Sequence, residues 1–103
     1  MTIKDDILEK SEIINEIAAK HGAYDIRIFG SISRGDDNEE SDIDILVKTR
    51  DKTSPWFPGG LIADLEELLG RRVEVVTEKG LNKLIREKVL NEAVSLWKRI
   101  RFI

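Results

Sequence analysis

The segment SDIDILV, residues 41–47, constrains the fold of this chain more than any other stretch. It is typical of a β-strand, in which successive side chains point to opposite faces of a sheet. Ile43 and Ile45 are therefore expected in a core, with Asp42 and Asp44 side by side on the opposite face. Aspartate is depleted in strands, so this pair indicates either a solvated strand face or a site for a divalent cation.

Apolar periodicity and turn residues predict the other elements around this segment. Helices are expected over residues 2–20, 60–69 and 81–98, and a short helical turn over 31–35. Strands are expected over residues 24–29, 43–49 and 71–78. The last helix should bury an apolar stripe of Leu81, Leu84, Ile85, Val89, Ala93, Val94 and Trp97. The order α-β-β-α-β-α predicts an α/β (α+β) fold with a single small mixed sheet flanked by helices.

Length and charge narrow the class of protein. The 103 residues are expected to form one domain, 1–103, with a modest core. The net charge of -3 argues against a direct nucleic-acid partner, which usually requires a basic patch. No segment has the pattern of a signal peptide or the roughly 18 apolar residues of a membrane span. We therefore expect a soluble, cytoplasmic protein without a membrane partner.

Two further features of the sequence become significant when they are considered together with the two aspartates. Gly30 and Ser31 end the first predicted strand, separated from Asp42 by a ten-residue spacer. Glycine lets the backbone approach a ligand, and a serine hydroxyl with free amides binds phosphate oxygens. Glu74, in VEVV, is a third acid within an apolar strand. Each feature alone is explained by a common turn or a solvated face, but together they indicate a two-metal phosphoryl-transfer site.

The combination of GSISRG, SDIDILV and VEVV resembles the nucleotidyltransferase superfamily related to DNA polymerase beta. That family has a Gly-Ser motif, a spacer, an Asp-x-Asp pair and a third acid on a later strand. The chain length and the spacer are similar to the minimal nucleotidyltransferases (MNT), and most of all to the MntA-type antitoxins that accompany HEPN-domain toxins. The resemblance extends from about residue 26 to residue 97.

The resemblance implies a role for each motif residue. The catalytic and metal-binding set would be Asp42, Asp44 and Glu74, and the nucleotide-binding set would be Gly30, Ser31 and Arg34. The acids would hold two Mg²⁺ ions, and the Gly-Ser pair would hold the triphosphate of ATP. Arg34 would meet a phosphate or, alternatively, pair with the acidic loop that follows it.

The implied activity is a Mg-dependent protein adenylyltransferase. It would transfer AMP from ATP to a tyrosine of a cognate HEPN toxin, expected to be an RNase, and inactivate that toxin within a hetero-oligomer. Two alternatives are an idle antitoxin that neutralises its toxin by binding alone and a small-molecule nucleotidyltransferase. Glu74, where the family more often has aspartate, and the acidic spacer favour the idle antitoxin, whereas the retained Gly-Ser pair and both aspartates favour the enzyme. The spacer acids Asp36, Asp37, Glu39 and Glu40 are interpreted as a solvated loop.

Three other features have local interpretations. His21 is expected to stabilise the C-terminus of the first helix. Trp56 and Phe57, in the loop before the second helix, are expected to pack on the core in preference to stacking on a base. The tail WKRIRFI, residues 97–103, is interpreted as a docking strip for a partner.

Overall fold

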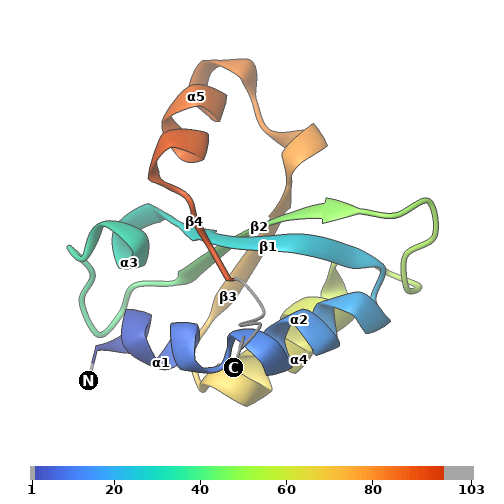
Figure 1. Ribbon diagram of the computed structural model, residues 1–103, viewed down its shortest axis with the longest axis horizontal. Coiled ribbons are helices and arrows are strands. Elements are labelled where there is room, and N and C mark those ends of the chain that lie inside the picture. Colours follow the sequence, from blue (N-terminus) through green and yellow to red (C-terminus); the bar gives the residue numbers. More distant parts are fainter. Residues whose placement is uncertain (1, 97–103) are drawn as a thin grey trace, which may run out of the picture.

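A computed structural model describes residues 2–96 of the chain (Figure 1). The elements in chain order are α1 (Ile3–Glu9), α2 (Ser11–Lys20), β1 (Ala23–Phe29), α3 (Gly30–Arg34), β2 (Ile43–Thr49), α4 (Gly59–Leu69), β3 (Val73–Thr77), the 3-10 turn η1 (Glu78–Gly80), α5 (Lys83–Glu92) and β4 (Val94–Ser95). The predicted fold class is confirmed. No helix within these residues has the length and apolar character needed to cross a membrane. Trp97 and the predicted docking tail lie outside the described residues.

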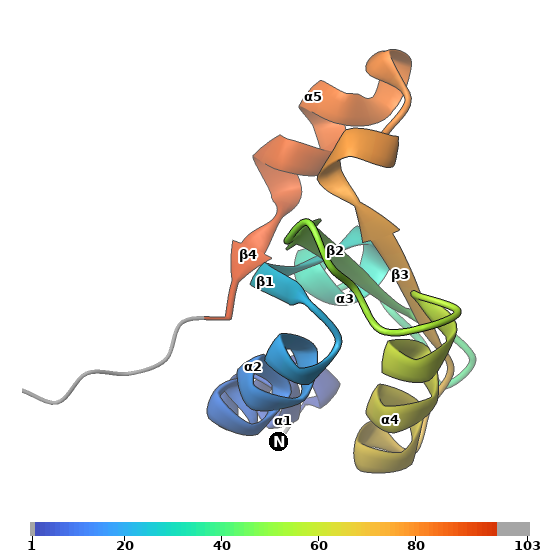
Figure 2. The same ribbon diagram turned by 90° about the vertical axis from the view of Figure 1, so that its right-hand side faces the viewer.

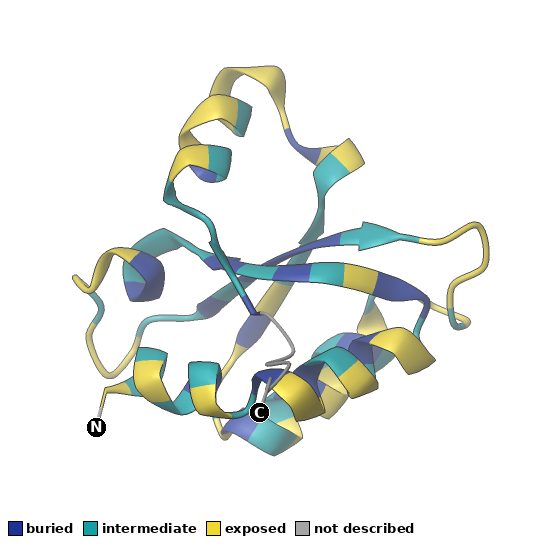
Figure 3. Ribbon diagram, in the orientation of Figure 1, coloured by how far each residue is buried: buried dark blue, intermediate teal, exposed yellow. Residues whose placement is uncertain are grey.

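The sheet has the strand order β3-β2-β1-β4. β1 pairs antiparallel with β2 and with β4, whereas β2 and β3 are parallel, so the sheet is mixed as predicted. Helices α1, α2 and α4 cover one face, and α5 stands on the other (Figures 1 and 2). The main core fills the space between the sheet and the first group of helices, where the buried positions of Figure 3 concentrate.

The alternation predicted for β2 is confirmed. Ile43 and Ile45 have no exposed surface and belong to the main core. Leu46 faces the other way and forms a smaller buried cluster with Leu81 and Val89 beneath α5. Asp44 lies on the same face as Leu46, since strand side chains alternate. The α5 side of the sheet is therefore apolar in the middle and acidic where β2 begins.

The first predicted helix is two helices, α1 and α2, joined at Lys10. The Ser11 hydroxyl donates a 2.6 Å hydrogen bond to the Leu8 carbonyl. Such bonding from serine to the preceding turn bends helices, which accounts for the break that apolar periodicity alone does not reveal. A capping box begins α1, because the Thr2 and Asp5 side chains each accept a hydrogen bond from the other residue's backbone N–H.

The prediction for the last helix was wrong at its end and for Leu84 and Ile85, whereas Leu81 and Val89 are buried as predicted. α5 stops at Glu92, and Val94 continues as β4, which pairs with Arg27 and Ile28 at the open edge of β1. Pairing with a free strand edge satisfies backbone groups that a helix would have satisfied internally. Leu84 is 90% exposed and Ile85 50% exposed, since α5 touches the sheet along only part of its circumference.

A β-bulge interrupts β1. Tyr24 pairs with Lys48, but Arg27 pairs with Leu46, so β1 has one residue more than β2 over this stretch. Asp25 adopts a φ of 51°, which marks the bulge. Strict alternation would place Tyr24 on the core face with Ile26 and Ile28, whereas the bulge turns Tyr24 outward and leaves both isoleucines buried.

The loop after β2 is fixed to the end of α2. Gly22 has a φ of +84°, and a Cβ there would overlap the Lys52 carbonyl oxygen, so both backbone conformation and space require glycine. The His21 ring contacts Ser54 Oγ through Nδ1 and Asp64 Oδ2 through Nε2, each at 2.7 Å, and so links α2 to this loop and to α4.

The two aromatic residues of this loop differ. Phe57 packs against the core as predicted, but Trp56 is 93% exposed, and the packing prediction was wrong for it. The loop follows the end of β2 opposite to Asp42 and Asp44.

Candidate active site

Strand register brings three of the predicted site residues together. Phe29, the last residue of β1, pairs with Asp44, and Asp44 pairs with Glu74 across the parallel β2–β3 ladder. Gly30 follows Phe29 directly and begins α3. The glycine at the end of one strand and the acids of two others therefore meet at one end of the sheet.

Gly30 lies so close to Asp44 that any side chain at this position would displace the Asp44 carboxylate. Its φ is +76°, and a Cβ built on it would overlap Asp44 Oδ2. Either condition alone disfavours a side chain. The Gly-Ser motif therefore touches the Asp-x-Asp motif.

Asp44 is the acid of this site whose pKa is raised. Burial raises the pKa of Asp44 to about 6, and the charge of Glu74 and a hydrogen bond with it add to the effect, followed by the charges of Asp42 and Glu92. Like charges held close together disfavour ionisation of one member. The cluster therefore has negative charge that the protein does not fully compensate, which suits a hard divalent cation.

The acids are not arranged as a complete set of metal ligands. Within residues 2–96, no three Asp, Glu, His or Cys side chains are arranged so that they could hold one ion. Glu74 is exposed, and Asp42, with a side chain 37% exposed, has Oδ1 4.0 Å from Arg72 Nε. The three carboxylates would therefore have to move closer together to share one cation.

Arg34, on α3, is held by two acids. Its Nη1 donates to Glu92 Oε2 at 3.0 Å, and its Nε donates to Asp36 Oδ2 at 3.2 Å. The alternative interpretation, pairing with the acidic loop, therefore describes one of its contacts. Three of the four loop acids are exposed as expected, namely Asp36, Glu39 and Glu40, whereas Asp37 is partly buried. Ser31 follows Gly30 in α3, and its carbonyl accepts bonds from the amides of Gly35 and Asp36.

Glu92 is a site residue that the sequence reasoning missed. Its Oε1 accepts a 3.0 Å hydrogen bond from the Gly30 amide, so it contacts the glycine as well as Arg34. An acid in the last position of a helix is unfavourable next to the negative end of the helix dipole. This mismatch was not visible in the sequence, because the predicted helix ran to residue 98 and placed Glu92 in its interior.

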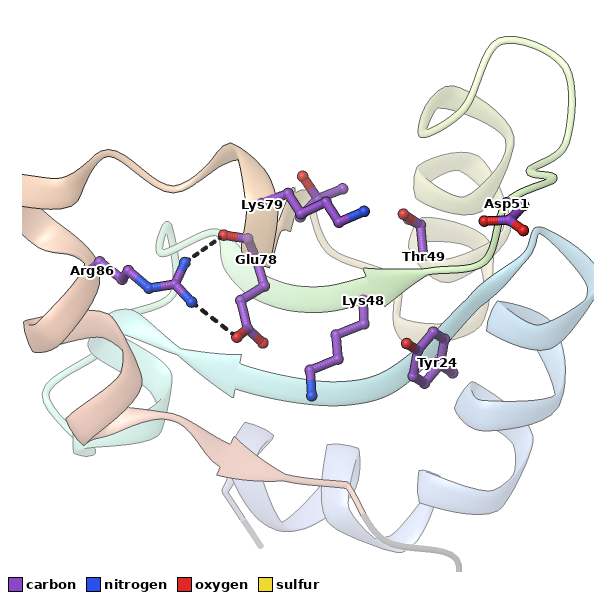
Figure 4. A pocket seen from close by; sticks show the side chains of 8 residues that line it. Tyr24, Lys48, Thr49, Asp51, Glu78, Lys79 and Arg86 are labelled. Atoms are coloured by element: carbon purple, nitrogen blue, oxygen red, sulfur yellow. Dashed lines mark hydrogen bonds and ion pairs between the residues drawn. The ribbon is translucent and has the colours of Figure 1, made fainter.

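A separate cleft of about 360 Å³ lies farther along β2 (Figure 4). It is lined by Tyr24, Lys48, Thr49, Asp51, Thr77, Glu78, Lys79 and Arg86. Lys48 is four residues from Asp44, about 13 Å along an extended strand. Lys48 is paired with Asp25 at 3.2 Å, and Arg86 with Glu78 at 3.1 Å. The cleft shares no residue with the acidic cluster.

Comparison with known proteins identifies the class. Residues 10–96 match the family model of the nucleotidyltransferase domain, which covers most of the chain. The chain therefore belongs to the nucleotidyltransferase domain family, in agreement with the resemblance of its motifs.

Two relatives and two solved structures define the type within this family. The chain is 40% identical over 91 residues to an inferred protein adenylyltransferase of Methanocaldococcus jannaschii, covering 88% of this chain and 98% of that protein. It is 39% identical over 79 residues to protein adenylyltransferase MntA of Thermococcus cleftensis, covering 77% and 80%. An inferred minimal nucleotidyltransferase of known structure superposes with a TM-score of 0.78 at 38% identity, covering 91% and 95%.

The second solved structure shares the fold. It is the complex of a tri-AMPylated HEPN toxin of Shewanella oneidensis with an MNT antitoxin, with a TM-score of 0.63 at 22% identity, covering 93% of this chain and 73% of that one. From the family model and the relatives, the chain is a nucleotidyltransferase enzyme, similar to MntA and to the minimal nucleotidyltransferase of known structure.

Proposed function

We propose that this protein is a Mg-dependent protein adenylyltransferase that acts as an antitoxin. It transfers AMP from ATP to a tyrosine of a cognate HEPN-domain toxin, an RNase, and silences that toxin in a cytoplasmic hetero-oligomer. The observation that carries the proposal is the contact of Gly30 with Asp44, with Glu74 paired to Asp44 on the next strand. The names of the relatives and the AMPylated toxin complex described above support the choice of donor, product and partner.

The donor set fits a divalent cation. Asp42, Asp44 and Glu74 supply carboxylate oxygens, which Mg²⁺ prefers, and the raised pKa of Asp44 shows negative charge that a cation would relieve. These three residues would hold two Mg²⁺ ions, which when bound would activate the acceptor hydroxyl and stabilise the leaving oxygen.

Residues of the chain itself would bind the phosphates of the nucleotide. Gly30 and Ser31 would receive the triphosphate, because the absence of a side chain at Gly30 lets phosphate oxygens approach the backbone. Arg34 would meet a phosphate with its guanidinium. The acceptor oxygen forms a bond to the α-phosphorus while the bond to pyrophosphate breaks. The acceptor proton passes to solvent, and the nucleoside monophosphate stays on the acceptor.

We further propose that residues 1–103 act as a single minimal domain. The described residues form one sheet with its helices, and all of them take part in that fold. The described residues contain no second unit beside this fold that could bind an acceptor. A protein partner that brings its own acceptor tyrosine suits such a domain better than a free small molecule.

Binding without catalysis is the second candidate function. Two observations favour it: Glu92 occupies both the Gly30 amide and Arg34, and the described acids do not form a ready group of three metal ligands. In that case the antitoxin would neutralise its toxin by covering it.

Incubation with ATP labelled at the α-phosphate, Mg²⁺ and the neighbouring gene product separates the two candidates. We expect label on the partner with the wild-type protein and with the control Glu39→Gln, an exposed acid of the solvated loop. The double variant Asp42→Asn/Asp44→Asn should lose at least about a hundredfold in rate, the scale of removing a major electrostatic group. Absence of transfer by the wild type, with neutralisation intact in the double variant, would establish binding alone.

A further inference from the structure

The side chain of Glu92 occupies the groups expected to receive the nucleotide. Its two oxygens accept hydrogen bonds from the Gly30 amide and from Arg34 Nη1, both at 3.0 Å. The side chain is only 15% exposed, so this is an inward-facing carboxylate and not one that samples solvent freely. An oxyanion bound by a backbone N–H and a guanidinium has the contacts of a phosphate oxygen pair.

The main chain at Glu92 is fixed independently of these contacts. The Ser33 hydroxyl donates a 2.6 Å hydrogen bond to the Glu92 carbonyl, and the Ala93 amide donates to the Val89 carbonyl at 3.0 Å. β4 then pairs with β1 directly after it. The side chain can therefore rotate away while the backbone of α5 stays in place.

Two facts indicate that the Glu92 carboxylate and a phosphate would compete for the same position. The Gly30 amide has one hydrogen and cannot donate fully to a carboxylate and to a phosphate at once. Glu92 also lies close enough to Asp44 for its charge to act on that residue. It therefore gains two strong contacts, but the like charges around it weaken its hold on Gly30 and Arg34.

We propose that Glu92 is an affinity-determining residue of the nucleotide site: its carboxylate occupies the phosphate position and leaves when the triphosphate binds. The inference rests on the proposed function and deepens it. Arg34 exchanges the Glu92 carboxylate for a phosphate. The wild-type protein therefore binds ATP more weakly than the same site would without the Glu92 carboxylate. Release of Glu92 also removes one of the negative charges that face Asp44.

The test compares Glu92→Ala with the wild type by titration calorimetry, using ATP with Mg²⁺ and, separately, inorganic tripolyphosphate. Removing the internal competitor should tighten both ligands by about five- to tenfold, the scale of one or two net hydrogen bonds. Glu92→Gln retains an acceptor for Gly30 but loses the charge that attracts Arg34, so its affinity should be intermediate. Glu87→Ala removes the same charge from an exposed position of the same helix and should bind as the wild type does.

The outcomes separate this inference from the function on which it rests. Equal or weaker binding by both Glu92 variants, with folding verified by circular dichroism, overturns the role of Glu92 and leaves the nucleotide site standing. If Glu92→Ala fails to fold, Glu92→Gln decides the matter alone, because it changes one atom. No binding of either ligand by the wild type or any variant overturns the nucleotide site and the inference together.

Discussion

Replacement of Asp44 by asparagine is expected to stabilise the metal-free fold at neutral pH. The substitution keeps the size of the side chain and its capacity to bond with Glu74, but removes the charge that faces three other acids. Burial and these charges raise the pKa of Asp44 from 3.8 to about 6. A group whose pKa is raised on folding binds more protons in the folded state, so stability is lost as the pH rises from 3.8 through about 6.

The size of the effect follows from the pKa. Since each unit corresponds to about 1.4 kcal/mol, the shift sets an upper limit of about 3 kcal/mol on the cost of ionised Asp44. The side chain is only half-buried, and solvent screening reduces this to about 1–2 kcal/mol. The free energy of unfolding of the asparagine variant should therefore exceed that of the wild type by about 1–2 kcal/mol above pH about 6. The difference should disappear below the ordinary pKa of aspartate.

Urea unfolding in EDTA, at about pH 7.5 and again at about pH 3.5, measures this difference. Glu39→Gln, in the exposed loop, serves as the control for loss of a negative charge and should change little. Added Mg²⁺ should stabilise the wild type more than the variant and so narrow the gap. If Asp44→Asn is less stable than the wild type at the higher pH without metal, the carboxylate has a compensating partner and the reasoning fails.

Three further predictions concern Gly30, the ion pair of Glu78 with Arg27, and the exposed residue Leu84. Gly30→Ala should abolish nucleotide binding and destabilise the fold by at least about 1 kcal/mol, because both φ and the contact with Asp44 exclude a Cβ; calorimetric titration of ATP and a thermal melt check both. Glu78→Gln removes the closer of the two ionised partners of the mostly buried Arg27, leaving Asp25 at 3.7 Å, and should cost about 1–3 kcal/mol. Arg27 lowers the pKa of Glu78, so that contribution is present at neutral pH and should vanish in acid, which urea titrations across pH will show. Leu84→Ser should change the free energy of unfolding by less than about 0.5 kcal/mol, because the residue is 90% exposed, and a loss above about 2 kcal/mol would place it in the core after all.

The local part of the site was predictable from the sequence. Alternation in SDIDILV separates Ile43 and Ile45 from Asp44 without knowledge of any partner strand, because the period of a strand is a property of the backbone. Gly30 was recognisable for a similar reason, since a glycine between a strand and a turn indicates an unusual φ or a close approach. The pairing of Asp44 with Glu74 was not predicted, because it depends on the adjacency and parallel register of β2 and β3.

The remaining part depends on tertiary contacts that a single sequence does not encode locally. Glu92 belongs to the site because α5 ends beside α3, and the predicted helix continued past that point. Val94 was assigned to the helix by periodicity, yet the free edge of β1 recruits it into β4. Leu84 fits an apolar stripe, but whether a stripe is buried depends on what the fold places against it.

The bulge at Asp25 gives β1 one residue that has no partner of its own. Tyr24 keeps its pairing with Lys48 on one side of the bulge, and Arg27 keeps its pairing with Leu46 on the other. A chain shortened by this single residue would retain both sets of pairings and the same core-facing isoleucines. Loss of a residue between Arg27 and Gly30 would instead draw the glycine away from Asp44. Length variation among relatives should therefore be tolerated at the start of this strand and forbidden at its end.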